Sequence, residues 1–177
     1  KSNFKGLEIF SNKIQIDNNA GHYFVTGDLN NSLDTIKDEL FVFFFKNKLK
    51  ENIIKEATFS TQNKFSFKLS KKIKVSDISI KSKIKLKKII YEKKHKFVND
   101  FLPTYENKIE LEDHDIELSY EKNSLILKGK GKIFIDNKFD KISYNINYKE
   151  KNYNFESVIQ LKNFPLEIKS LDYKKEK

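Results

Sequence analysis

Carboxylates and one histidine gather in a short stretch in the second half of the chain, the densest group of reactive side chains in the sequence. The group consists of Glu110, Glu112, Asp113, His114, Asp115 and Glu117. Carboxylates at this density are able to bind calcium or to act as an acid and base pair. The flanking apolar residues, Ile109 and Leu111 before the group and Ile116 and Leu118 within and after it, alternate as they do in strands. We therefore expect two strands joined by a tight connection, with the glutamates at solvated positions and no metal site.

Other patterns that carry catalysis or bind cofactors are not found. The three histidines, His22, His95 and His114, are far apart and lack the spacing of a metal site. The stretch Gly129-Lys130-Gly131-Lys132 has neither the glycine spacing nor the following helix of a phosphate-binding loop. No serine or threonine lies in a nucleophile elbow, and the chain has no cysteine. We expect a protein that is not an enzyme and that has no cofactor.

The charge of the chain, formally +10, raises the question of a nucleic-acid or acidic membrane partner. All 35 basic residues are lysine, and 25 acidic residues are interspersed with them. Arginine, which pairs bidentately with guanine edges and phosphates, is absent. Abundant Lys, Asn, Ile and Phe are also what an AT-rich genome encodes. We expect no specific nucleic-acid partner, and we interpret most of the charge as the solvated side of strands.

Period-two alternation of apolar residues is the dominant pattern of the sequence. It predicts strands with one apolar and one polar face, separated by about 8 to 12 residues as in antiparallel meanders. Turns are expected at 18–21, 136–138 and 150–152. The alternating residues are Leu7 and Ile9, Ile14 and Ile16, Tyr23 and Val25, Phe65, Phe67 and Leu69, Ile73 and Val75, Ile78 and Ile80, Ile84 and Leu86, Ile109 and Leu111, Ile116, Leu118 and Tyr120, Leu125 and Leu127, Ile133 and Ile135, and Ile142, Tyr144, Ile146 and Tyr148.

Two segments depart from this alternation. A candidate N-cap at Asn31 or Ser32 is followed by apolar residues with helical spacing, which predicts a covering helix near residues 33–45. These residues are Leu33, Ile36, Leu40, Phe43 and Phe44. The alternative for the apolar run at 41–45 is a buried strand. A second short helix or turn is expected near 97–102, before Pro103.

The predicted fold is therefore mainly β, a curved antiparallel amphipathic sheet with one covering helix. An apolar sheet face has to be buried against a second sheet, a closed barrel, a helix or a ligand. The chain has no methionine, not even at position 1, so we expect residues 1–177 to be a single β-rich segment of a larger repetitive protein. No apolar run approaches the roughly 20 residues that cross a bilayer, which places any membrane anchor outside this segment.

The second half of the chain resembles the AsmA-like proteins of Gram-negative bacteria, especially the large members anchored in the inner membrane. The resemblance covers 107–175 best and rests on "LILKGKGKIFIDNKFDKISYNI" at 125–146 and on the closing "FPLEIKSLDYKK". The earlier "HYFVTGDLNNSLDTI" at 22–36 is similar to the strand, glycine and helix units of these proteins. The resemblance implies that Gly129 and Gly131 are bends in the strand.

The resemblance implies an open β-groove that spans the periplasm and conducts phospholipid between the inner and outer membranes. Its partners would be phospholipid acyl chains, neighbouring β segments of the same chain, and the inner membrane through a segment outside this one. Two alternatives stay open: a self-contained β-sandwich that serves binding or adhesion, and a basic sheet that binds nucleic acid. The residues expected to line the groove are Phe65, Phe67, Leu69, Leu125, Leu127, Ile133, Ile135, Ile142, Tyr144 and Ile146.

Overall fold

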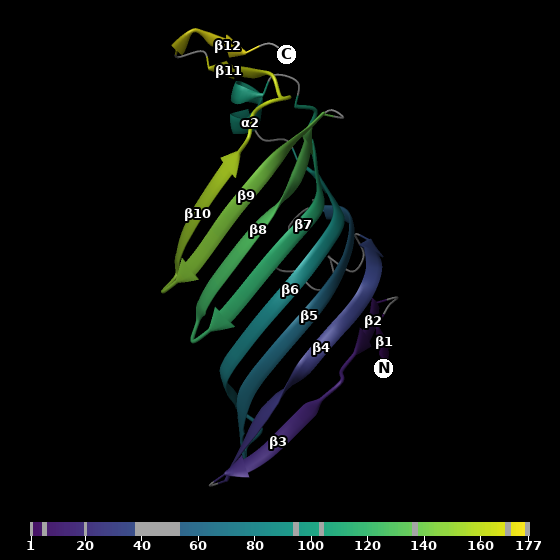
Figure 1. The fold of residues 1–177 in the computed structure, drawn as a ribbon. Coiled ribbons are helices and arrows are strands. Elements are labelled where there is room, and N and C mark those ends of the chain that lie inside the picture. The colour runs from purple at the N-terminus through teal and green to yellow at the C-terminus, as the bar shows by residue number, and fades with distance from the viewer. Residues whose placement is uncertain are drawn as a thin grey trace.

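The computed structural model describes residues 2–4, 7–19, 21–37, 54–93, 96–102, 105–135, 138–168 and 171–175. Within these residues the chain is mainly antiparallel β-sheet that does not close on itself (Figure 1). The main sheet contains β1 (Ser2–Phe4), β2 (Leu7–Phe10), β3 (Ile14–Asn19), β4 (His22–Lys37), β5 (Ile54–Ser70), β6 (Val75–Glu92), β7 (Lys108–Glu121), β8 (Ser124–Ile135), β9 (Lys138–Lys149) and β10 (Asn152–Ile159). A short helix, α2 (Lys96–Phe101), and a two-stranded sheet of β11 (Leu166–Ile168) and β12 (Tyr173–Lys175) complete the described part.

Strand order in the main sheet follows the sequence, as the predicted meander requires. The order is β1-β2-β4-β5-β6-β7-β8-β9-β10, and β3 pairs with β4 beside β2. Among the described strands, β10 pairs only with β9, so it forms one edge of the sheet, and β1 and β3 lie along the other. The described sheet therefore has open edges and does not close into a barrel.

The predicted covering helix is not supported. Residues 33–37 belong to β4, where Thr35 pairs with Thr58 and Ile36 with Ala57, and residues 38–45 lie outside the described residues. The possible N-cap Asn31 donates its side-chain amide to the carbonyl oxygen of Phe59, at 3.2 Å, instead of capping a helix. Helical spacing here is a weak local signal, and pairing along β5 overrides it because each pair satisfies backbone groups inside the sheet. The second prediction is confirmed, since α2 covers most of 97–102.

The central strands are longer than the alternation suggested. Residues 108–121 form one strand, so the prediction of two strands with a tight connection at the acidic group is wrong. The apolar positions change from odd (Ile109, Leu111) to even (Ile116, Leu118) because the register against β8 shifts between Glu112 and Asp115. Such a β-bulge inserts one residue without ending the strand.

Bulges on three strands lie in a row across the sheet. Further register shifts occur on β4 between Asn31 and Asp34 and on β6 opposite Thr58 and Phe59. Pairing of Phe59 with Leu86, and of Leu86 with His114, brings the bulges of β6 and β7 next to each other. Bulges bend a strand and increase its twist. Figure 1 shows the resulting twisted sheet as a single layer.

Tight turns join consecutive strands, and some of them lie where the sequence predicted turns. Glu150 and Lys151 have φ of 53° and 68°, the left-handed values of a two-residue turn, so the turn predicted at 150–152 is confirmed. Gly21, with φ of 81°, lies in the predicted turn between β3 and β4. The Lys122-Asn123 turn between β7 and β8 was not predicted. Residues 136–137 lie outside the described residues.

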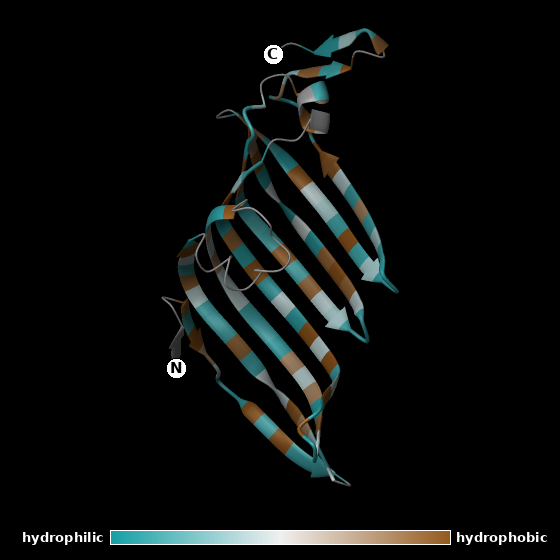
Figure 2. Ribbon diagram, turned by 180° about the vertical axis from the view of Figure 1, so that it is seen from behind, coloured by the Kyte–Doolittle hydropathy of each residue, from teal (hydrophilic) through white to brown (hydrophobic). Residues whose placement is uncertain are grey.

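The packed core lies toward one end of the sheet, near α2 and the C-terminal segment (Figures 1 and 2). Tyr105, Ile133, Ile135 and Phe164 form its main cluster, and Val98 of α2 packs against it. A smaller cluster contains Ile36 and Ala57, with Leu7, Phe59 and Ile89 packed around them. Figure 2 shows hydrophobic and hydrophilic residues alternating along the strands, which is the pattern that gives the sheet two different faces.

Candidate functional site

The strand register gathers the alternating apolar residues on one side of the sheet, which we call the apolar face. Leu127, for example, pairs with Leu118 on β7 and with Ile146 on β9, and Phe67 pairs with Val25 on β4. Residues opposite each other on neighbouring strands point to the same side. The apolar face includes Ile14, Ile16, Tyr23, Val25, Phe65, Phe67, Leu69, Ile80, Ile84, Leu86, Ile116, Leu118, Tyr120, Leu125, Leu127, Ile133, Ile135, Ile142, Tyr144, Ile146, Tyr153 and Phe155.

All ten residues that we predicted to line a groove lie on this face. They are on β5, β8 and β9. The bulges on β6 and β7 keep these strands in a register that puts all ten side chains on the same side of the sheet. Ile133 and Ile135 differ from the rest, since they are only 6% and 4% exposed within the core cluster with Tyr105 and Phe164. Protein already covers these two side chains, so they are not available to line a groove.

Away from that core the described residues leave much of the apolar face in partial contact with solvent. Phe65, Phe67, Leu125 and Leu127 are half-buried, through their neighbours on the same sheet. The most exposed side chains are on the edge strands: Ile14 and Ile16 on β3 are 57% and 63% exposed, and Tyr153 and Phe155 on β10 are 75% and 62% exposed. Monomeric proteins rarely leave contiguous apolar patches larger than a few hundred Å² in water.

A polar pair lies within the apolar face at the row of bulges. The His114 side chain, 1% exposed, lies against Gly131, and the Tyr144 ring lies against Gly129. His114 Nε2 donates to the carbonyl oxygen of Lys132 at 2.9 Å, so in the neutral ring Nδ1 accepts from the Tyr144 hydroxyl at 3.2 Å. Burial lowers the pKa of His114 and raises the pKa of Tyr144 to about 12, which keeps both groups neutral.

No pattern in the sequence predicted this pair. We expected Gly129 and Gly131 to be bends, but they leave room for rings from β9 and β7. A Cβ on Gly131 would lie 2.2 Å from Cδ2 of His114, and one on Gly129 would lie 2.3 Å from Cζ of Tyr144. Glycines at alternate positions of a strand, near an isolated histidine that falls in the apolar pattern, are the only local hint.

The opposite side, the polar face, explains the acidic group on β7. Lysines on β6 and β8 flank it, and Asp113 accepts from Lys87 at 2.9 Å and from Lys132 at 3.0 Å. Hydrogen bonds from these two lysines lower the pKa of Asp113 to about 2. Lys88 pairs with Glu110 and lies 3.6 Å from Glu112. The carboxylates therefore act as partners for cross-strand lysines, and the described residues contain no group of three metal-ligand side chains.

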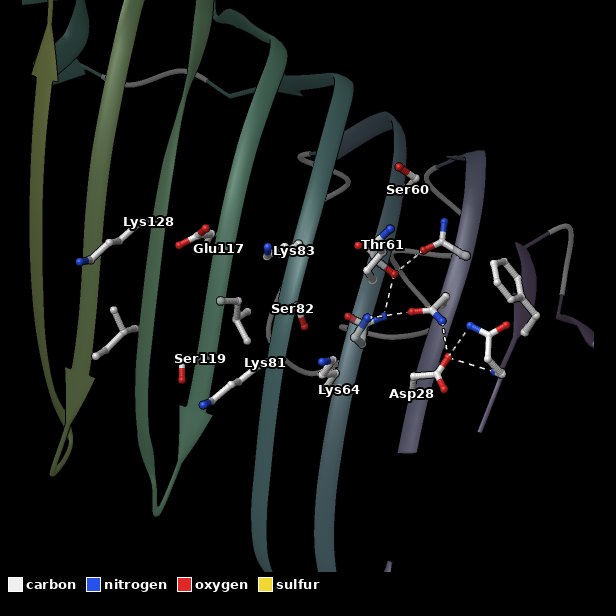
Figure 3. Close-up of a pocket in the computed structure, with 18 residues that line it drawn as sticks. Asp28, Ser60, Thr61, Lys64, Lys81, Ser82, Lys83, Glu117, Ser119 and Lys128 are labelled. Carbon is white, nitrogen blue, oxygen red and sulfur yellow. Dashed lines mark hydrogen bonds between the residues drawn. The ribbon is translucent and has the colours of Figure 1, made fainter. Parts of the chain in front are cut away.

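Aromatic and basic residues of the last hairpin lie on different faces. The Tyr148 and Tyr153 rings, whose centroids are 4.5 Å apart, are on the apolar face, whereas Lys149, the last residue of β9, is on the polar face. Three hollows on the described part of the sheet lie on the polar face, and one of them has a volume of about 1080 Å³ (Figure 3).

Comparison of the chain with protein-family models, with curated proteins and with solved structures finds no match. Among the described residues, no helix has the length and apolar character needed to cross a bilayer.

Proposed function

We propose that this chain is a non-enzymatic segment of an AsmA-like protein, and that its apolar face contacts the acyl chains of phospholipids moving between the inner and outer membranes. The observation that supports the proposal best is the apolar face itself. It continues across β3 to β10, and the described residues pack over it only near α2 and the smaller cluster. The proposed location is the periplasm, with an inner-membrane anchor in another part of the protein.

Acyl chains suit this surface energetically. Each methylene removed from water contributes about 0.8 kcal/mol, and no directional contact is needed. The contact region that we propose excludes Ile133 and Ile135 and centres on the half-buried Phe67, Leu127 and Ile146. The polar groups on this face include Asn63, Ser82, Asp140 and the His114–Tyr144 pair, and they are buried or hydrogen-bonded.

The open edges support a role as one segment of a longer sheet. Within the described residues, β10 is paired along one side only over Asn152–Ile159, and β3 over Ile14–Asn19. Exposed edge strands form further ladders readily, because their backbone groups lack sheet partners. Neighbouring β segments of the same protein are the proposed partners at these edges.

The alternatives fit the described residues less well. A β-sandwich needs a second layer over the apolar face, whereas the described strands form one layer and a separate two-stranded sheet. A nucleic-acid platform needs aromatic and basic residues on one surface, whereas here Tyr144 and Tyr148 are on the apolar face and Lys149, next to Tyr148 on β9, is on the polar face.

A photo-crosslinking residue introduced into the full-length protein tests the proposal. At Phe67 or Ile146 it should capture phospholipid, whereas at the neighbouring Lys68 or Asn147, on the polar face, it should not. These pairs are matched because the two members of each are consecutive residues of one strand. Equal labelling of both members would contradict the proposed face.

A charge on the apolar face separates lipid contact from protein packing. Leu127→Glu should reduce lipid transfer while leaving the fold intact, because a half-buried residue facing lipid does not pack in the core. Ile135→Glu should unfold the chain, since it would bury a carboxylate beside Tyr105 and Phe164. If Leu127→Glu also unfolds the chain and no lipid adduct forms at Phe67, a sandwich becomes the better description.

A further inference from the structure

The hollow on the polar face crosses the sheet from β4 to β8, away from the acidic group. Its volume of about 1080 Å³ is large enough for a small-molecule ligand. Figure 3 shows Lys64, Lys81, Lys83 and Lys128 among the residues that line it. None of these four lysines makes an ion pair with any residue in the described part of the chain.

Two of the lysines oppose each other directly. Lys64 on β5 and Lys81 on β6 are cross-strand partners, so their side chains leave the same face of the sheet side by side. Like charges in this position destabilise a sheet. Lysines elsewhere on this face, such as Lys88 and Lys132, lie beside carboxylates that balance them. The Lys64–Lys81 pair is a local excess of positive charge that a bound anion would neutralise.

The two carboxylates of the hollow offset only part of this charge, although Asp28 on β4 is the cross-strand partner of Lys64. Asp28 accepts hydrogen bonds from the backbone amides of Asn12 and Lys13, at 3.0 and 2.9 Å, and from the side chains of Asn12 and Asn30. The hydrogen bond from the Asn12 amide is the main reason that the pKa of Asp28 is lowered. Glu117 lies between Lys83 and Lys128 in the register and offsets one of them. Four lysines against two carboxylates leave two positive charges.

Neutral hydrogen-bonding side chains complete the lining. Ser60, Gln62 and Ser119 alternate onto the polar face with the lysines, and they lie among the residues around the hollow. Hydroxyl and amide groups bind sugar hydroxyls, and lysine binds phosphate as a point charge. We infer that this hollow binds a phosphorylated, hydroxyl-rich group, that is, a sugar or inositol phosphate, either free or as the headgroup of a lipid.

Isothermal titration calorimetry with inositol hexakisphosphate tests the inference, with uncharged inositol as the reference ligand. The phosphorylated compound should bind and inositol should not. Lys64→Gln combined with Lys81→Gln should weaken binding by roughly tenfold or more, a change of about 1.4 kcal/mol. The same double variant should keep or raise the melting temperature, because it removes a like-charge pair. Loss of binding would then not be due to unfolding.

The matched control removes two lysines elsewhere. Lys72 and Lys74 are exposed at the turn between β5 and β6, outside the hollow. Replacing both by Gln should change the affinity by less than about twofold, because salt screens the interaction of distant exposed charges with the ligand. Equal losses in the two double variants, or no binding of the hexakisphosphate, would overturn the inference.

Vesicles distinguish the two sources of the phosphorylated group. Phosphatidylcholine vesicles that contain phosphatidylinositol phosphates should bind the protein through Lys64 and Lys81 if the ligand is a lipid headgroup, and soluble inositol hexakisphosphate should compete. Binding of the soluble compound alone would identify a free sugar phosphate. The inference does not depend on lipid contact at the apolar face, because the two surfaces are on opposite sides of the sheet.

Discussion

Replacement of Gly131 by alanine tests whether the His114 ring depends on the missing side chain. The new Cβ would lie 2.2 Å from Cδ2 and 2.5 Å from Cγ of His114. The ring has little freedom to move, because Nε2 donates to the Lys132 carbonyl oxygen and Nδ1 accepts from Tyr144. Its exposed fraction of 1% also means that neighbouring atoms surround it.

The expected cost follows from three contributions. Forcing an extra carbon into a packed site costs about 1 to 3 kcal/mol. A displaced His114 would lose a hydrogen bond, which costs about 1 kcal/mol more. Replacing glycine reduces the entropy of the unfolded chain and returns about 0.4 to 1 kcal/mol. The free energy of unfolding of Gly131→Ala should therefore fall by about 2 kcal/mol.

A double-mutant cycle separates this clash from a general effect on the strand. Urea unfolding followed by circular dichroism would be measured for the parent, Gly131→Ala, His114→Ala and the double variant. His114→Ala should itself be destabilising, but it removes the ring that meets the new Cβ, so adding Gly131→Ala should then cost little. An equal cost of Gly131→Ala in both backgrounds, or a cost below about 0.5 kcal/mol in the parent, would refute the reasoning.

Two further predictions concern His114 and Asp140. Burial lowers the pKa of His114, so the unfolded chain, in which this pKa is near 6.5, binds the proton more readily than the folded chain. The free energy of unfolding should therefore be highest above about pH 7 and fall toward about pH 5.5, by up to about 1.4 kcal/mol per pH unit. Urea midpoints across this range should show the fall, and an equal fall in His114→Gln would contradict the prediction. Asp140, 3% exposed, accepts from the backbone amides of Lys162, Asn163 and Phe164 at 3.0 to 3.2 Å. Asp140→Ala should cost about 2 to 4 kcal/mol and should increase amide hydrogen exchange at Phe164, whereas unchanged exchange there would show that the C-terminal segment is held by other contacts.

The sequence by itself determined the amphipathic character of the strands and their meander. Alternation has a period of two residues, and it is a local property that the side chains of a single strand carry. It therefore predicted correctly that Phe67, Leu127 and Ile146 lie on one face, with their lysine and asparagine neighbours on the other. The turn at 150–152 was predictable because polar residues interrupt the alternation there, although Glu150 and Lys151 are not residue types that favour the left-handed conformation they adopt.

The tertiary structure decided everything that depends on a neighbouring strand. A change of parity between Leu111 and Ile116 is consistent with a turn or with a bulge, and only pairing with β8 distinguishes them. Leu33 and Ile36 have helical spacing, but β5 offers a ladder of hydrogen bonds that local propensity does not outweigh. Ile133 and Leu127 look alike in the sequence, yet Tyr105 and Phe164 cover only Ile133. Which apolar residue is packed, and which glycine holds a ring, depends on contacts between residues far apart in the chain, and local periodicity contains no information about them.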